Sequence, residues 1–245
     1  MSKTPVRIAF GGGGTDVEPY SSDWGGFVVN STINLYNRCF LKKRKDNSII
    51  IRSNYDFESL KFDVDSLKTT FNKYFKLENL FKAIFYHLKP PFGVDVYIHS
   101  DVPKRAGLGS SASLSTSIIA GILKLEGKEL KLDDVAEKAY YVEEKILKNE
   151  GGRQDQYSSV HGGFNSIEFK GGSDVNIRPM ILSKSFKNDL KSNLILYYTG
   201  IPHVSGNLVE KQVQFYLREE QSAKYFLDRL KEIANKIHDA LKEEN

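Results

Sequence analysis

The sequence is poor in cysteine and in long apolar runs. Cys39 is the one cysteine of the 245 residues, so no disulfide can form within the chain, which fits a reducing compartment. No apolar run reaches the length that spans a bilayer, and the N-terminus lacks the apolar centre of a signal peptide. We therefore expect a cytoplasmic protein that does not associate with membranes.

Strong charge of one sign is also missing. The chain has 35 Lys and Arg against 31 Asp and Glu, a formal net charge of +4 that is spread along its length. This balance is too mild to indicate nucleic-acid binding. The 5 histidines are scattered without an acid or cysteine at ligand spacing, so we predict no zinc site. No Gly-x-Ser-x-Gly pattern supports a hydrolase.

The clearest positive signal is a glycine-rich loop that runs into an apolar helix. Residues 103–113 read Pro-Lys-Arg-Ala-Gly-Leu-Gly-Ser-Ser-Ala-Ser, and no charge follows before Lys124. A helix N-terminus offers unpaired N–H groups that favour an anion, and glycines let the backbone approach it closely. Ser110 and Ser111 add hydroxyls that can cap the helix, bind phosphate or ligate magnesium. The stretch predicts a cradle for nucleotide phosphates.

Two familiar nucleotide loops fit this stretch poorly. A Walker loop needs lysine after its last glycine, whereas Ser110 follows Gly109. The stretch from Gly107 to Ala112 satisfies the dinucleotide pattern Gly-x-Gly-x-x-Ala, which belongs directly after a first strand with an acid about 20 residues on. Here Pro103 precedes the glycines in a long loop and Glu126 follows a helix, so we disfavour dinucleotide binding.

Two further glycine-rich breaks carry acids. A strand over Thr4–Phe10 leads into four glycines and Thr15-Asp16, more glycine than a tight turn requires, which favours a binding loop with Asp16 aimed at ligand hydroxyls. A helix from Lys131 to about Lys148 leads into Gly-Gly-Arg-Gln-Asp, ending at Asp155. Taken alone, Asp155 fits a turn acid satisfied by local amides. Together with the other motifs it favours catalysis.

The remaining chain reads as a mixture of strands and helices, with a glycine-rich linker at 171–173. Apolar alternation predicts strands over residues 26–35, 37–43, 93–99, 163–169, 175–179 and 193–199. Helical spacing predicts helices over residues 77–88, 206–219 and 221–242.

These motifs resemble those of a known family, the GHMP kinases. Residues 103–113 resemble the second signature of that family, and residues 4–8 with 11–16 resemble its first. The Gly-Gly-Gly-Thr-Asp form, with residues 151–157, is similar to the heptose 7-phosphate kinase branch and the related fucokinase domains, which phosphorylate the anomeric hydroxyl of a sugar. The resemblance covers residues 4–169. It implies a sugar kinase that uses ATP and Mg²⁺, with heptose 7-phosphate the foremost substrate.

The resemblance also implies roles for individual residues. ATP phosphates would lie against Pro103, Gly107, Leu108, Gly109, Ser110, Ser111 and Ala112. Mg²⁺ would be bound by Ser111 and Glu144. Asp155 would accept the proton of the sugar hydroxyl, with Arg7 as the cation beside it and Arg153 as a second candidate. The sugar would contact Gly13, Gly14, Thr15, Asp16 and Arg153.

The implied fold is α+β with two domains. Residues 1–170 would form the N-terminal domain, which is like domain 2 of ribosomal protein S5, and residues 171–245 an incomplete ferredoxin-like domain. The family's third glycine-rich signature has no match, since beyond Gly172 the only glycines are Gly200 and Gly206. A shortened chain, a remainder carried by a separate chain, and a member that no longer turns over ATP all stay open. An apolar helix face at Phe226, Leu230 and Ile237, if exposed, would predict a homodimer or a partner chain.

The alternatives to a heptose kinase are therefore of two kinds. Another sugar kinase of the family, like a fucokinase or a galactokinase, would share the same machinery. A non-catalytic homologue would bind sugar or nucleotide in a regulatory role.

Overall fold

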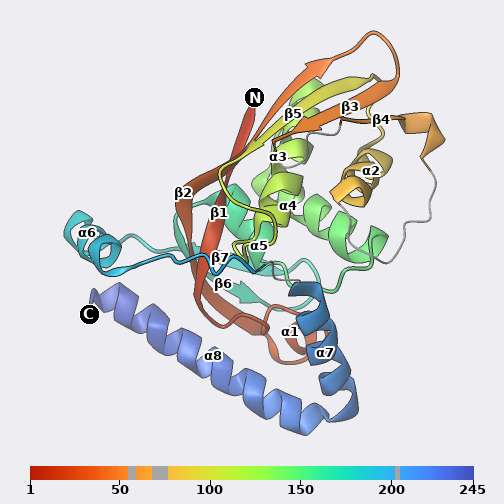
Figure 1. The fold of residues 1–245 in the computed structure, drawn as a ribbon. Coiled ribbons are helices and arrows are strands. Elements are labelled where there is room, and N and C mark those ends of the chain that lie inside the picture. The colour runs from red at the N-terminus through yellow and green to blue at the C-terminus, as the bar shows by residue number, and fades with distance from the viewer. Residues whose placement is uncertain (55–58, 68–76, 202–204) are drawn as a thin grey trace.

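The computed structural model describes residues 1–54, 59–67, 77–201 and 205–245, which form one mixed sheet flanked by helices (Figure 1). The strand order is β4-β3-β5-β2-β6-β7, and β1 pairs with β2 off this path. The β3–β5 pair is parallel and the other pairs are antiparallel. The strands are β1 (Ser2–Gly11), β2 (Gly26–Lys43), β3 (Ser48–Ser53), β4 (Leu60–Asp63), β5 (Val94–Ser100), β6 (Phe164–Phe169) and β7 (Val175–Pro179).

The long strand β2 joins the two halves of the sheet. Its first residues, Gly26–Ser31, pair with β6, and its last, Asn37–Lys43, pair with β5. The sequence predicts two strands here, but β1 pairs with β2 on both sides of Tyr36 and keeps the strand continuous. The end of β1 and the start of β2 thereby bring the first glycine-rich loop beside the centre of the sheet.

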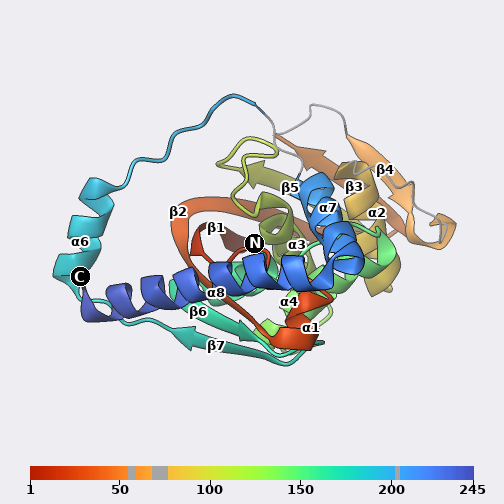
Figure 2. The same ribbon diagram turned by 90° about the horizontal axis from the view of Figure 1, so that it is seen from below.

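Helices cover both faces of the sheet. On one face α2 (Leu77–Leu88), α3 (Ser110–Leu125) and α4 (Leu132–Tyr141) bury apolar side chains such as Phe85 and Ile118 against Ile51 and Ile98. On the other face the long helix α8 (Glu220–Glu243) crosses β1 and β2, as Figure 2 shows, and packs Ala234 against Val29. Shorter helices complete the fold: α1 (Tyr20–Trp24), α5 (Gln154–His161), α6 (Lys184–Asn193) and α7 (Ser205–Arg218). The described part of the chain holds no helix long and apolar enough to cross a bilayer.

Several predicted elements are confirmed, and two further predictions, besides the break within β2, are not. The helix over residues 77–88 has the predicted bounds. The predicted linker at 171–173 is instead the turn of the β6–β7 hairpin, in which the Lys170 N–H donates to the Asp174 carbonyl over 2.9 Å. The sheet thus continues past residue 170, and the division into two domains stays a prediction.

The strand predicted over residues 193–199 is wrong. Asn193 ends α6, and residues 194–199 have no strand partner in the described ranges. Ile195 is 91% exposed and Tyr197 is 81% exposed. The β-branched and aromatic residues that favour a strand do so only where a neighbouring strand and a packed face are available.

Candidate active site

The glycine-rich loop at 103–113 ends on the N-terminus of α3. Gly109 is the N-cap residue, with a φ of 68°, and Gly107 has a φ of 75°, a region that side chains other than glycine rarely adopt. A Cβ built on Gly107 would meet no atom within 4 Å, so the loop faces open space there. The first N–H groups of α3 therefore lie behind an open, glycine-lined loop, an arrangement suited to phosphate.

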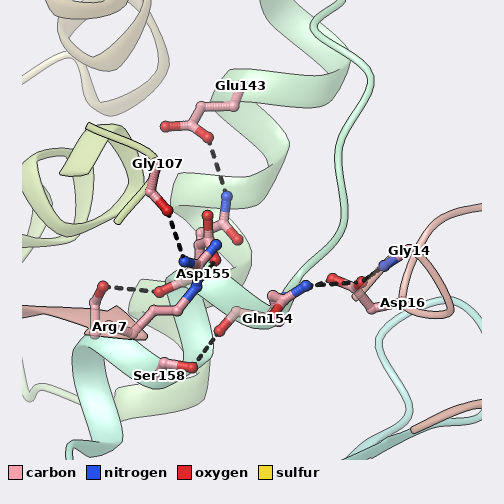
Figure 3. Close-up of polar contacts among 10 residues, drawn as sticks. Arg7, Gly14, Asp16, Gly107, Glu143, Gln154, Asp155 and Ser158 are labelled. Carbon is pink, nitrogen blue, oxygen red and sulfur yellow. Dashed lines mark hydrogen bonds and ion pairs between the residues drawn. The ribbon is translucent and has the colours of Figure 1, made fainter. Parts of the chain in front are cut away.

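Asp155 lies directly against this loop. It stands in the first turn of α5, and its Oδ1 accepts a hydrogen bond from Nε of Arg7 over 2.6 Å (Figure 3). A Cβ on Gly109 would lie 3.0 Å from the carboxyl carbon of Asp155. Arg7 also donates from Nη1 to the carbonyl of Gly107 over 3.0 Å. The structure therefore brings Arg7, Asp155 and the glycine-rich loop at 103–113 together, the neighbourhood that the sequence predicts.

Glu143, and not Glu144, is the acid beside Ser111. The Ser111 hydroxyl donates to Oε1 of Glu143 over 2.9 Å, and Gln156 donates from Nε2 to Oε2 over 3.0 Å. Glu144 instead pairs with Lys145 over 2.6 Å. This corrects the predicted pairing of Ser111 with Glu144.

Both acids lie in a π-helical turn over Val142–Ile146. The Leu147 N–H donates to the carbonyl of Val142, five residues back, over 3.0 Å. Such a turn departs from the usual spacing of 3.6 residues, so the face on which each acid lies cannot be counted from the α-helical repeat.

The surroundings of Glu143 fit a magnesium ion. Burial raises the pKa of Glu143 to about 7, the hydrogen bonds from Ser111 and Ser115 oppose this, and the charge of Asp155 adds to it. No three acidic, histidine or cysteine side chains gather as a metal site in the part of the chain that the structure describes. Magnesium bound to a nucleotide needs only one or two carboxylates, because phosphates and water supply its other oxygens. The hydroxyl of Ser111 and the carboxylate of Glu143 match that donor set.

In the loop at residues 11–16, the polar side chains of Thr15 and Asp16 make hydrogen bonds to other groups of the protein. The buried Thr15 hydroxyl donates to the carbonyl of Gly12 over 2.8 Å and accepts from the N–H of Phe27 over 3.0 Å. This corrects the prediction that Thr15 faces the sugar, since its hydroxyl joins the loop to β2. Gly13 is the exposed member of the loop.

Asp16 is also turned inward, and it is 1% exposed. It accepts hydrogen bonds from the Gly14 N–H and from two nitrogens of Gln154. Burial raises the pKa of Asp16, the hydrogen bond from the Gln154 backbone lowers it and the charge of Asp155 raises it. Its role as a sugar ligand stays a prediction, since all three of these contacts are to protein groups.

Arg153 has a different place from the one predicted. Its buried guanidinium lies 3.3 Å from carboxylate oxygens of both Glu18 and Glu137, and 3.9 Å from the ring centre of Tyr140. These contacts tie the start of α5 to α4 and to the segment before α1. The cation that contacts Asp155 is therefore Arg7. Arg153 instead holds the start of α5 against α4 and against the segment before α1.

The other predicted phosphate-loop residues divide between open and packed positions. Pro103 is exposed, whereas Ala112 is buried inside α3. The carbonyls of Leu108 and Ser110 accept hydrogen bonds from the Arg7 N–H and the Asn37 side chain, over 3.0 and 3.1 Å. The side chain of Ala112 thus packs inside the protein, and a contact of its backbone N–H with phosphate stays a prediction.

Sequence reasoning did not identify the three glutamines that frame this site. Gln154 and Gln156 contact Asp16 and Glu143, and Gln212 reaches from α7 to donate to the Gly14 carbonyl over 2.8 Å. Glutamine has no spacing signature, so only the fold reveals these contacts. A cavity of about 450 Å³ lies elsewhere, between the start of β1 and the second half of α3, and no predicted site residue lines it.

Comparison with known proteins agrees with the motifs and the geometry. The family model described as "GHMP kinases N terminal domain" matches residues 76–163. The D-glycero-alpha-D-manno-heptose 7-phosphate kinase of Campylobacter jejuni is 31% identical over 250 residues, which cover 98% of this chain and 70% of that protein. The bifunctional fucokinase/GDP-fucose pyrophosphorylase of Arabidopsis thaliana is 25% identical, over 97% of this chain and 24% of that protein.

A solved structure gives the same result in three dimensions. The D-glycero-D-manno-heptose 1-phosphate kinase from Bacteriodes thetaiotaomicron superposes with a TM-score of 0.79 at 25% identity, covering 99% of this chain and 73% of that one. The predicted α+β fold of this family is thereby confirmed. Because the Campylobacter jejuni protein is 31% identical over 98% of this chain, the chain belongs to the GHMP kinases, phosphotransferases whose acceptor is a hydroxyl group.

Proposed function

We propose that this chain transfers the γ-phosphoryl group of ATP to the anomeric hydroxyl of a sugar phosphate, with heptose 7-phosphate as its substrate. Two relatives whose names include heptose phosphates match nearly all of the chain, which supports this sugar class. The chain spans 70% of the Campylobacter protein and about a quarter of the bifunctional one, so the activity of either whole protein reaches this chain only as a proposal.

One observation carries the proposal: the carboxylate of Asp155 lies between the guanidinium of Arg7 and the backbone of Gly109. A carboxylate held there can accept the proton of an attacking hydroxyl, while the cation favours its ionised form and the loop holds the phosphates. Arg7 contacts both Asp155 and the carbonyl of Gly107, so it also keeps the base and the loop in register. The sugar would lie against the exposed Gly13 beside Gly14.

Ser111 and Glu143 are the residues that we propose to hold Mg²⁺ with the nucleotide. When bound, the ion supplies charge neutralisation to the phosphates. Glu143 binds a cation in its ionised form, and Gln156 orients this carboxylate through Oε2.

The test is ADP release from the purified chain with a panel of sugars and sugar phosphates. We expect heptose 7-phosphate to stimulate release, and Asp155→Ala to abolish the stimulation while ATP binding persists. If Asp155→Ala is as active as the parent chain, Asp155 is not the base. If ATP binds and no sugar stimulates turnover, the chain is a non-catalytic binding homologue. Stimulation by fucose or galactose alone would assign a different sugar kinase, and the fucokinase relatives make fucose the first alternative to include.

The proposal extends to a partner and a location. On α8 Phe226 is 59% exposed and Leu230 is 39% exposed, whereas Ile237 is half-buried, so part of the predicted apolar face is open. A second copy of the chain or a separate polypeptide would bury it, and light scattering of the purified chain separates these two cases. We also propose a cytoplasmic location, where the buried thiol of Cys39 stays reduced.

A further inference from the structure

Both carboxylate oxygens of Glu143 accept hydrogen bonds from protein side chains. Ser111 and Ser115, one turn apart on α3, each donate to Oε1, over 2.9 and 3.0 Å. Gln156 donates from Nε2 to Oε2 over 3.0 Å, the contact drawn at Glu143 in Figure 3. A carboxylate offers about four acceptor sites, so these three donors leave about one for a further partner. The acid is therefore held from both oxygens and can still bind a cation.

Ser115 ties this acid to the turn of α3 that carries Ser111. The Ser115 side chain is fully buried, so water does not compete for its hydroxyl. The hydroxyl oxygen lies 3.0 Å from the carbonyl oxygen of Ser111 and 3.0 Å from Oε1 of Glu143, and its single hydrogen is shared between these two acceptors. Ser115 thus helps to set the separation of Ser111 and Glu143, the two proposed donors to Mg²⁺.

Gln156 ties the same acid to the helix of the catalytic base. It directly follows Asp155 in the first turn of α5 and is 3% exposed. Glu143 comes from a different element, the π-helical turn after α4. Phosphoryl transfer depends on holding the base, the phosphates and the ion at fixed positions. A direct hydrogen bond between these two elements is suited to that task.

The carbonyl end of the Gln156 amide has no partner. An ionised carboxylate only accepts hydrogen bonds, so the amide nitrogen faces Glu143 and Oε1 is the remaining atom. This oxygen is buried and meets no donor within the described ranges of the chain. Buried acceptors are generally satisfied in native proteins, so an exception points to a donor that binds later. Magnesium bound to a nucleotide keeps several waters, and each of them can donate a hydrogen bond.

We propose that Ser115 and Gln156 are positioning residues of the metal centre, each of which holds one oxygen of Glu143, and that together they set the affinity of the site for Mg²⁺. This inference deepens the proposed function and rests on it, because it takes Ser111 and Glu143 as the donors to the ion. Groups that hydrogen-bond to metal ligands typically change metal affinity by about 10- to 100-fold when they are removed. Neither Ser115 nor Gln156 bonds to the ion itself.

The test measures metal-dependent nucleotide binding without turnover. The Kd of a fluorescent, non-hydrolysable ATP analogue is measured with saturating Mg²⁺ and again with a chelator. By linkage, the ratio of these two values gives the contribution of the ion at the site. We expect Mg²⁺ to tighten binding to the parent by about tenfold or more. Ser115→Ala and Gln156→Leu should each lower this ratio about tenfold, with the Kd in chelator within about threefold of the parent.

Each variant has a matched control at the next position of its helix. Thr116→Val removes a buried hydroxyl that donates to the backbone carbonyl of Ser113 over 3.0 Å. Tyr157→Phe removes a hydroxyl that donates over 2.9 Å to Glu137, an acid outside the site. Both controls remove a hydroxyl donor without changing a contact of Glu143, so their Kd ratios should stay within about twofold of the parent. Thermal melting shows whether each variant is folded.

Turnover supplies a second readout that a merely structural role would not change. If the chain phosphorylates a sugar, Ser115→Ala and Gln156→Leu should raise the Mg²⁺ concentration for half-maximal rate by about tenfold or more. The KM for the sugar should stay within about threefold, because neither side chain is a proposed sugar contact. A raised sugar KM with an unchanged Mg²⁺ requirement would overturn the inference.

The outcomes separate this inference from the proposed function. If Mg²⁺ tightens binding to the parent and both variants match the parent, the inference is wrong and the proposed function is unaffected. If both variants lose the gain from Mg²⁺ but the parent phosphorylates no sugar, the inference holds and the proposed function is wrong. If Mg²⁺ does not tighten binding to the parent, the proposed metal site and the inference are both wrong. Should Gln156→Leu fail to fold, Ser115→Ala with its control decides.

Discussion

The surroundings of Asp155 and the stretch after β7 differ in what their side chains contact: polar side chains contact one another in the first, and apolar side chains face solvent in the second. Around Asp155 the polar groups contact one another: Arg7 binds the acid, Ser111 binds Glu143, and Asp16 binds Gln154. After β7 large apolar groups face solvent, as at Ile195 and on the outer side of α8. The first region has the pre-organised polar contacts that catalysis requires, and the second has apolar surface of the kind that other polypeptides cover.

The largest expected effect lies at the cation of the first region. Arg7→Met removes both the partner of Asp155 and the contact to the carbonyl of Gly107, so kcat should fall by about 100-fold or more. Arg38→Met is the control, since Arg38 is also paired with an acid, Asp101, but lies outside the site. Steady-state ADP release measures both. If the two variants release ADP at equal rates, then Arg7 has no special part in the reaction and the proposed active site is wrong.

The second prediction compares two neighbouring acids. Glu143→Gln should lower kcat by about 100-fold and raise the Mg²⁺ concentration needed for half-maximal rate, because Glu143 lies beside Ser111. Glu144→Gln should stay within about threefold of the parent, because Glu144 pairs with Lys145 instead. Magnesium titrations of the initial rate decide this. The reverse order of the two effects would restore the assignment made from sequence.

A third prediction compares apolar groups inside and outside the core. Ile118→Ala empties a fully buried position on α3 and should lower the free energy of unfolding by about 2–5 kcal/mol. Ile195→Ala should change it by less than about 0.5 kcal/mol, because that side chain is already exposed. Urea unfolding of the two variants is the measurement. A large loss from Ile195→Ala would mean that a partner covers residues 194–199 in solution.

The last prediction is a pH dependence of stability. The pKa of Glu143 is raised from 4.5 to about 7, so its contribution to stability is full below pH 4.5 and is lost as the pH rises through 7. In the absence of magnesium, the parent should therefore lose stability relative to Glu143→Gln between these values, by roughly 3 kcal/mol at most. Urea unfolding at pH 5, 6 and 7.5 with a chelator tests this. If the free energies of unfolding of the parent and of Glu143→Gln change with pH in the same way, then the pKa of Glu143 is not raised in the folded protein.

The motifs of the first region could be predicted because their chemistry is local. The glycines at 107 and 109 need left-handed backbone, and an apolar run after two serines starts a helix, so the loop and α3 follow from neighbouring residues. The contact of Arg7 with Asp155 was predicted from family resemblance, since 148 positions separate the two residues.

Other features depend on packing that no local pattern reports. Glu143, which lies in the π turn at Val142–Ile146, is the acid beside Ser111, and no local sequence pattern indicates a π turn. The helix α5 is short and follows two glycines, so the local pattern predicts a glycine-rich break there and does not indicate a helix. Residues 194–199 have the composition of a strand, but a strand also needs a partner, and composition carries no information about one.

Phosphoryl transfer at Asp155 is tested most directly by phosphorus NMR of single-turnover reactions with ATP, Mg²⁺ and heptose 7-phosphate. The parent chain should give a new resonance for a phosphate at the anomeric carbon, and Asp155→Asn should give about 100-fold less or none in the same time. Transfer by Asp155→Asn at the parent rate, or no anomeric phosphate from the parent although it binds both substrates, would contradict the account.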